Sequence, residues 1–254
     1  EIILFCGVHF MAETAAILSP GKTVLMPDAR AGCPMADMIT AEDVGELRRQ
    51  HPGAVVVAYV NTSAAVKGEV DVCCTSANAA QIVERYPRDQ EIVFVPDQNL
   101  GDWVNRRTGR HMVLWPGYCP THAIIRPEEV LARRVEHPDA KVMAHPECPR
   151  AVVDLADVVT STSGMLRYPE TDDAPAYIVA TEVSLLAGLR RRHPGRAFIA
   201  ASEYAVCPNM KMGTLEGAVS ALRDGLNEIV VPEDVRERAL RAVSRMVEEP
   251  GRKG

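Results

Sequence analysis

Short runs of apolar residues alternate with segments of helical periodicity along the chain. The apolar runs predict strands at Ile2–Phe5, Val24–Met26, Val55–Val60, Ile92–Val95, Met112–Trp115, Lys141–Ala144, Tyr177–Val179 and Ala197–Ala200. Strands that are apolar at every position are typical of parallel sheets covered on both faces. The segments between them predict helices such as Ala41–Gln50, Ala77–Arg85, Pro127–Val135 and Glu182–Arg192. This βα order predicts an α/β protein with parallel sheets.

The chain also repeats itself when it is shifted by 86 residues. Three dipeptides then coincide with identical dipeptides. Cys33-Pro34 matches Cys119-Pro120, His51-Pro52 matches His137-Pro138, and Asp71-Val72 matches Asp157-Val158. A third Cys-Pro, at Cys207, follows another β–α–β stretch. The repeat therefore predicts three similar units, each delivering one Cys-Pro after a strand.

The three units are expected to be α/β domains of three-layer sandwich type around a pseudo-threefold axis. They comprise residues 33–118, residues 119–207, and a first unit made of both chain ends, residues 1–32 with 208–254. The tail offers this first unit a helix at Thr214–Arg223, a strand at Glu228–Val231 and a helix at Glu233–Glu248. The unit looks short, so we expect that a segment is missing before Glu1.

Composition narrows the function classes. With a net charge of −6, two Trp and four Phe, the chain offers no basic or aromatic surface for nucleic acid, and no apolar run is long enough for a membrane helix. Its seven cysteines are odd in number and widely spaced, which argues against a disulfide framework. We therefore expect these cysteines to be reduced thiols or metal ligands, and we expect the protein to be cytoplasmic.

The three Cys-Pro cysteines, Cys33, Cys119 and Cys207, suggest a metal centre. Three cysteines from three units can bind three irons of a cubane cluster and leave the fourth iron open as a Lewis acid. The alternative is that they are three buried small hydrophobes, and the residues alone leave this open. We expect Cys6, Cys73 and Cys74 to be core residues, and Cys148 lacks a cysteine at its matched position, Thr62.

Other polar residues follow strand ends, where parallel sheets collect ligands. Under the shift, Tyr59 matches His145, Asn61 matches Glu147, and Thr75-Ser76 matches Ser161-Thr162. His145 and Glu147 lie at i and i+2 of an extended segment and form either an acid/base set or a hydrogen-bonded surface pair. Ser76, Ser161 and Thr162 lie where helices are expected to begin, either as anion-binding groups or as plain N-caps.

Several segments carry a resemblance to a known family: GVHFMAE (7–13), AGCPMAD (31–37), YVNTSAAVK (59–67), CTSANA (74–79), PDQNLG (96–101), WPGYCPTH (115–122), AHPECP (144–149), STSGM (161–165) and CPNMKMGTLE (207–216). With these motifs the chain resembles the quinolinate synthases over essentially its whole length. The resemblance implies three α/β domains and a [4Fe-4S] cluster on Cys33, Cys119 and Cys207. It also implies a transferase of NAD biosynthesis that condenses iminoaspartate with dihydroxyacetone phosphate, releasing phosphate and water.

The family's site residues carry over to Tyr59, Asn61, Ser76, His145, Glu147, Ser161, Thr162 and Met210, with Glu147, His145 and Tyr59 in catalytic roles. The iminoaspartate would come from an aspartate oxidase or dehydrogenase. The family's early His-x-Tyr and Gly-Asp-Ser motifs do not occur in this chain. Rival interpretations are a non-catalytic iron–sulfur or redox-sensing protein, an inactive fragment, or a cluster-free hydrolase or transferase. The hydrolase lacks support because no G-x-S-x-G is present, and no P-loop or G-x-G-x-x-G indicates nucleotide binding.

Overall fold

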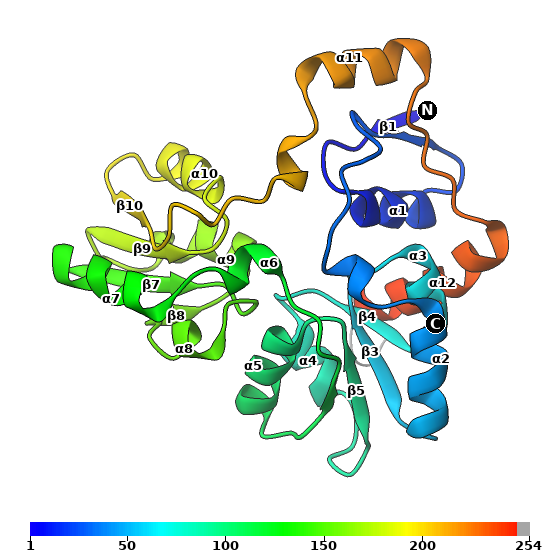
Figure 1. Cartoon of the computed structure of the whole chain (residues 1–254), viewed down its shortest axis with the longest axis horizontal. Coiled ribbons are helices and arrows are strands. Elements are labelled where there is room, and N and C mark those ends of the chain that lie inside the picture. Colours follow the sequence, from blue (N-terminus) through cyan, green and yellow to red (C-terminus); the bar gives the residue numbers. More distant parts are fainter. Residues whose placement is uncertain (248–254) are drawn as a thin grey trace.

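A computed structural model describes residues 1–247 of the chain. Within these residues every strand pairing of the three sheets is parallel, which confirms the predicted α/β class. Figure 1 shows three lobes around a common centre, each lobe containing one sheet. None of the helices in this part of the chain is both long and apolar enough to cross a membrane.

The second unit is built on a sheet of order β4-β3-β5-β6, formed by Val72–Cys74, Val55–Tyr59, Ile92–Val95 and Val113–Leu114. Helices cover both of its faces: α2 (Ala41–Gln50), α3 (Ala64–Glu69), α4 (Ala79–Glu84) and α5 (Gln98–Thr108). Because successive strand residues point to opposite faces, Val57 and Phe94 enter one core cluster while Val56 and Val93 enter another. This two-sided burial explains why the strands are apolar throughout.

The third unit repeats this plan with a sheet of order β8-β7-β9-β10, formed by Val158–Val159, Ala140–Ala144, Ala176–Ala180 and Ala197–Ala200. Its helices are α6 (Pro120–Ala123), α7 (Pro127–Glu136), α8 (Arg150–Val153), α9 (Thr162–Arg167) and α10 (Leu185–Arg192). The strand register follows the 86-residue shift, because Val57 pairs with Val72 and Met143 pairs with Val158. The repeat read from the sequence is therefore a repeat of structure.

Side-chain contacts obey the same shift. The Asp71 carboxylate accepts from the backbone N–H of Val56 at 2.8 Å and from Arg48 at 3.0 Å. The Asp157 carboxylate accepts from Val142 N–H at 2.7 Å and from Arg134 at 3.0 Å, the matched residues of the third unit. Each Asp thus fastens a helix to a strand at the same point.

Three His-Pro pairs end helices, two of them at positions matched by the 86-residue shift. His51, His137 and His193 are the C-cap residues of α2, α7 and α10, with φ of −123°, −134° and −130° and ψ of 68°, 72° and 69°. In each case the backbone N–H closes the last helical turn, and proline follows where the helix cannot continue.

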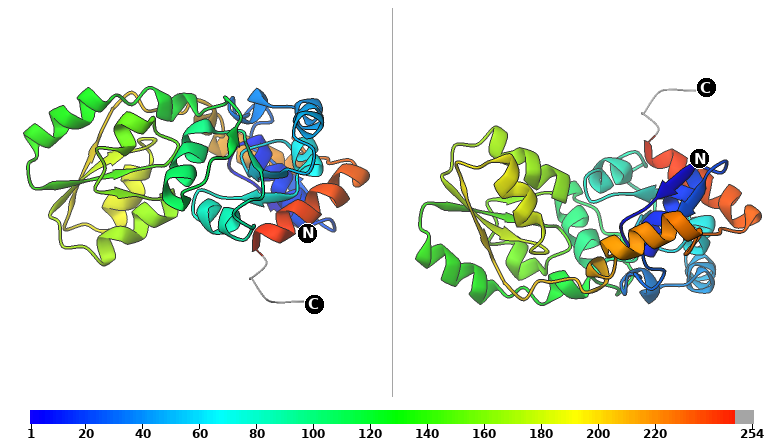
Figure 2. Two further views of the ribbon diagram at one scale, coloured as in Figure 1. Left: turned by 90° about the horizontal axis from the view of Figure 1, so that it is seen from below. Right: turned by 90° about the horizontal axis from the view of Figure 1, so that it is seen from above.

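The first unit contains β1 (Ile2–Leu4), β2 (Thr23–Leu25), α1 (His9–Leu18) and α11 (Leu215–Asp224). The strand predicted at Glu228–Val231 is wrong: Glu228 forms only a single antiparallel bridge with Leu25. Asn227, at a positive φ of 58°, donates its side-chain amide to the Met26 carbonyl at 3.1 Å and turns the chain there. Figure 2 shows α11 lying across the short two-stranded sheet.

The last helix, α12 (Glu233–Val247), packs mainly on α3 and β4 of the second unit, although the sequence assigned it to the first. Ala242 and Val243 on α12 complete the core cluster that contains Val66 and Cys73. Glu248, the last residue of the predicted helix, lies outside the described residues. The division of the chain into three domains stays a prediction. The helix α12 follows the first unit in the chain but packs on the second.

Candidate functional site

The ends of β3 and β7 bring Tyr59 and Glu147 together. Tyr59 is the last residue of β3, and Glu147 lies three residues past the end of β7. The Tyr59 hydroxyl donates to Glu147 Oε1 at 2.5 Å, across the boundary between the second and third units. Asn99 on α5 supports this junction by donating to the Glu147 carbonyl at 3.2 Å.

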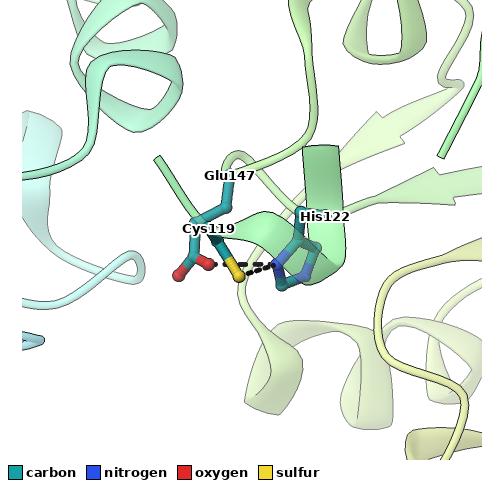
Figure 3. A group of neighbouring side chains, drawn as sticks. All are labelled: Cys119, His122 and Glu147. Carbon is teal, nitrogen blue, oxygen red and sulfur yellow. Dashed lines mark hydrogen bonds and ion pairs between the residues drawn. The ribbon is translucent and has the colours of Figure 1, made fainter. Parts of the chain in front are cut away.

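Glu147 is the centre of a buried polar cluster. Its Oε2 lies 3.0 Å from His122 Nδ1, and its Oε1 lies 3.8 Å from His145 Nδ1. The His122 and His145 rings stack at 4.8 Å between centroids. All of these side chains are buried, and Figure 3 shows Glu147, His122 and Cys119 directed toward one another.

The surroundings fix the charge of this cluster. Burial disfavours the Glu147 carboxylate, but His122, His145 and the Tyr59 hydroxyl more than offset it and hold the pKa of Glu147 below its usual range. Burial and then the neighbouring Glu147 charge raise the pKa of Tyr59 well above its usual value, so the phenol keeps its proton. Burial lowers the pKa of His145 to about 4, so that this ring is neutral.

The backbone assigns the tautomer of His145. The Glu147 N–H donates to His145 Nδ1 at 3.3 Å, so Nδ1 is the acceptor and Nε2 carries the proton. His122 Nδ1 faces two acceptors, the Glu147 carboxylate and the Cys119 sulfur at 3.1 Å, and therefore carries a proton. His122 thus presents an N–H to the Glu147 carboxylate, whereas His145 presents its unprotonated Nδ1 to the Glu147 backbone and carries its proton on the other nitrogen.

Each of the three Cys-Pro cysteines precedes a short helical turn. These turns are residues Ala36–Met38 after Cys33, α6 after Cys119, and Asn209–Lys211 after Cys207. The sulfurs of Cys33 and Cys119 accept backbone N–H groups from these turns. Such N–H donors stabilise a thiolate, the form that binds iron.

Hydrogen bonds join the three cysteine loops to one another. Asn209, two residues after Cys207, donates to the carbonyl of Gly32 at 2.9 Å. The Tyr118 N–H, next to Cys119, points at the Met38 sulfur at 3.4 Å. The Glu182 carboxylate, from the third unit, accepts from the Cys207 N–H at 3.2 Å. The loop of Cys33 therefore contacts the loops of both other cysteines.

The donor set fits a group that needs several thiolates. Burial first, then the negative charges of Glu147 and Cys207, raises the pKa of Cys33 to about 11. Burial and Glu147 likewise raise the pKa of Cys119. A cationic iron centre would lower the pKa values of both thiols and favour the thiolate forms that bind it. Asp97 Oδ2, also buried, has no hydrogen-bond partner among residues 1–247, so polar capacity remains unmet beside these groups.

The other four cysteines differ in setting. Cys73 and Cys74 are buried in β4, and Cys148 is buried with its thiol donating to the Ala180 carbonyl at 3.3 Å. Cys6 is exposed, so the prediction that it is a core residue is wrong. Since β1 ends at Leu4, Cys6 lies in the loop beyond the strand and not on its buried face.

The remaining predicted residues are placed less uniformly. Ser161 is the N-cap of α9, and its hydroxyl accepts the Gly164 N–H at 3.2 Å, while Thr162 is exposed on the first turn. Ser76 contacts the Tyr59 hydroxyl, but Asn78, and not Ser76, is the N-cap of α4. Asn61 is half-buried and Met210 is 56% exposed.

Two residues of the cluster were missed by the sequence reasoning. His122 lies one helical turn after Cys119, so the C-P-T-H spacing was an available signal that both side chains share one face. Asp97 caps α5 by accepting the Leu100 N–H at 2.7 Å, and burial and the Glu147 charge raise its pKa. Asp97 lies two residues after the end of β5, so its position just beyond a strand was the available signal.

The parallel α/β units thus surround a buried polar cluster and three cysteine loops. This arrangement is typical of an enzyme whose active site lies between duplicated domains. Comparison with known proteins agrees: residues 1–248 match the family model described as quinolinate synthetase A protein. The chain belongs to the quinolinate synthase family.

Curated relatives carry the same description. A quinolinate synthase of Geobacter metallireducens is 50% identical over 250 residues, which cover 98% of this chain and 82% of that protein. One from Dehalococcoides mccartyi is 50% identical over 247 residues, covering 97% and 82%. A third, from Geotalea uraniireducens, is 49% identical over 250 residues, covering 98% and 82%. This chain is therefore a member of an enzyme family named for making quinolinate.

Proposed function

We propose that this chain catalyses the condensation of iminoaspartate with dihydroxyacetone phosphate to quinolinate, phosphate and water, in the cytoplasm and in the synthesis of NAD. The observation that supports it is the buried Glu147 carboxylate, which accepts from Tyr59 at 2.5 Å and lies 3.0 Å from His122, beside the Cys119 thiol. An acid/base group and a proposed cofactor ligand thus occupy one place, as the family's reaction requires.

Cys33, Cys119 and Cys207 would hold a [4Fe-4S] cluster. When bound, it would supply a Lewis-acidic iron without a protein ligand. The iminoaspartate would be delivered by an aspartate oxidase or dehydrogenase, because an imine does not persist long in water.

The chain's own residues would move the protons. Glu147 is a weak base while it accepts from both Tyr59 and His122, and each donor that a substrate displaces makes it a stronger one. A proton taken by Glu147 has two neighbours in reach, the Tyr59 hydroxyl and His122 Nδ1. His122 Nε2 continues the chain to the Thr181 hydroxyl at 2.8 Å. Neutral His145 keeps an Nε2–H that can orient a carboxylate or hydroxyl.

Binding of the substrates would involve Asn61, Ser76, Ser161, Thr162 and Met210, which follow the family motifs. Two contacts support this proposal: Ser76 lies against the Tyr59 hydroxyl, and Ser161 lies at the start of α9. These are roles proposed from the resemblance, and the acid/base roles of Glu147, His145 and Tyr59 rest on the contacts above.

The decisive experiment is Glu147→Gln in the full-length protein, purified without oxygen. This change keeps the size of the side chain and one acceptor oxygen but removes the base and replaces the second acceptor by an NH2 donor, so quinolinate formation should fall at least about 10²-fold while the visible absorbance of the cluster stays. Glu129→Gln is the matched control, because Glu129 is a carboxylate of the same unit that contacts Arg126 and Ser202 away from the site. Turnover of Glu147→Gln at the rate of the control would refute the acid/base assignment.

Cysteine variants separate the cluster from the chemistry. Cys33→Ser, Cys119→Ser and Cys207→Ser should each lose the visible absorbance, whereas Cys6→Ser and Cys73→Ser should keep it. An iron and sulfide count on each protein checks the result. A bound cluster without any turnover would favour the alternative of a redox-sensing protein on the same scaffold.

A further inference from the structure

Cys119, His122 and Glu147 form a compact set of metal-binding atoms. One atom from each residue lies within 4.8 Å of the others, and the residues are buried or half-buried. We propose that this trio binds one Zn²⁺ when no iron–sulfur cluster occupies Cys119. The inference goes beyond the proposed function and does not require that the cluster forms.

The chemistry of the donors suits Zn²⁺. It takes thiolate, imidazole and carboxylate ligands at about 2.3, 2.0–2.1 and 2.0–2.2 Å, so ligand atoms around a tetrahedral ion lie about 3.4–3.6 Å apart. In the structure His122 Nδ1 is 3.1 Å from Cys119 Sγ and 3.0 Å from Glu147 Oε2. An ion in place of the shared proton needs these two pairs to open by only a few tenths of an ångström, and the third pair, Cys119 and Glu147, already lies within 4.8 Å.

Second partners already hold the ligands in place. Thr181, buried at the end of β9, contacts His122 Nε2 at 2.8 Å and so leaves Nδ1 directed at the other two ligands. Tyr59 donates to Glu147 Oε1, which leaves Oε2 for the ion. Outer hydrogen bonds of this kind orient the ligands of zinc sites and tune their affinity.

Occupancy by zinc and by the cluster would exclude each other, because Cys119 is a ligand of both. Three protein ligands leave the fourth position of Zn²⁺ to water, as in open zinc sites. Zinc in the cell or in the purification buffer would then compete with cluster assembly at this one cysteine. The ligands that zinc does not share, Cys33 and Cys207, distinguish the two states.

The test is a titration of cluster-free, reduced protein with Zn²⁺ against a chromophoric chelator. We expect one Zn²⁺ per chain, and with Co²⁺ a charge-transfer band of a single thiolate ligand. His122→Ala and Cys119→Ser should each weaken binding at least tenfold, whereas Cys33→Ser and Cys207→Ser should change it less than threefold. Thr181→Val keeps all three ligands and should weaken binding about tenfold through the loss of its contact to His122.

Several outcomes would overturn the proposal. Binding that survives His122→Ala, or no binding at micromolar Zn²⁺ in a protein with native circular dichroism, would remove the trio as a site. Loss of binding in Cys33→Ser or Cys207→Ser would place the ion on the three cysteines instead. Reconstitution adds an independent check, since excess Zn²⁺ should slow cluster assembly in the parent protein and not in His122→Gln.

Discussion

Gly164, in the first turn of α9, lies against Thr160, which precedes the helix. A methyl group at Gly164 would collide with Thr160. A Cβ at Gly164 would be 1.9 Å from Thr160 Oγ1 and 3.0 Å from Thr160 Cβ. A rotation of the threonine side chain can move Oγ1 away but leaves Cβ in place. Gly164→Ala therefore forces α9, with Ser161 at its start and buried Met165 within it, to shift.

The magnitude follows from a comparison with a second helical glycine of the same unit. A Cβ at Gly188, on α10, would meet only Leu166 Cδ2 at 3.4 Å, so Gly188→Ala gains helix propensity without a clash. Overpacking in a filled region costs about 1–3 kcal/mol. The free energy of unfolding of Gly164→Ala should thus be lower than that of Gly188→Ala by about 1–3 kcal/mol.

Urea unfolding followed by circular dichroism measures this difference. Thr160→Ala removes Oγ1 and the methyl group, and in the Gly164→Ala background it should recover part of the lost stability, which a double-mutant cycle isolates. Equal stability of Gly164→Ala and Gly188→Ala, or no coupling to Thr160, would refute the steric reasoning.

Three further predictions follow from the contacts described. Asp71→Ala and Asp157→Ala should lower the free energy of unfolding by similar amounts, roughly 1–3 kcal/mol each, because each leaves a strand N–H unpaired; unequal urea midpoints would contradict the structural repeat. Burial lowers the pKa of His145 from 6.5 to about 4, so the unfolded chain binds this proton at a higher pH than the folded chain does. The free energy of unfolding should therefore fall by up to roughly 3 kcal/mol as the pH drops from 6.5 to 4. His145→Gln should lack this loss in denaturant titrations. Because burial lowers the pKa of Lys67 from 10.5 to about 8, stability should rise by up to roughly 3 kcal/mol between pH 8 and 10.5, and Lys67→Met should lack that rise in denaturant titrations.

The sequence predicted the elements that depend on local pattern. The helix expected at residues 41–50 has those bounds, and its matched copy begins at Pro127 as expected, because a proline start and a His-Pro end mark it. The pattern failed at Glu228–Val231, where Asn227 turns the chain and leaves one bridge. It also could not show that α12 packs on the second unit, since an amphipathic helix does not specify which sheet it covers.

Site residues that directly follow a strand could be predicted from the sequence. Residues that reach the site through contacts between distant segments could not. Tyr59, His145 and Glu147 were found from the shift, and the structure brings them together. His122 lies 25 residues before Glu147 in the chain, and no local spacing indicates that its ring reaches that carboxylate. Cys6 was mispredicted for a local reason: the strand ends at Leu4, two residues earlier than the position of Cys6, so its side chain lies in an exposed loop.

The structural repeat has a consequence for how such a centre can arise. Three identical subunits around an axis would supply three equal thiols but also three equal walls, so that a tyrosine on one wall would appear on all. Tandem copies within one polypeptide remove that constraint: the backbone register and the Asp anchors stay alike, while Tyr59 and Asn61 in one copy stand where His145 and Glu147 stand in the next. The fold thus combines a nearly symmetric backbone frame with an asymmetric set of side chains, which three identical subunits could not supply.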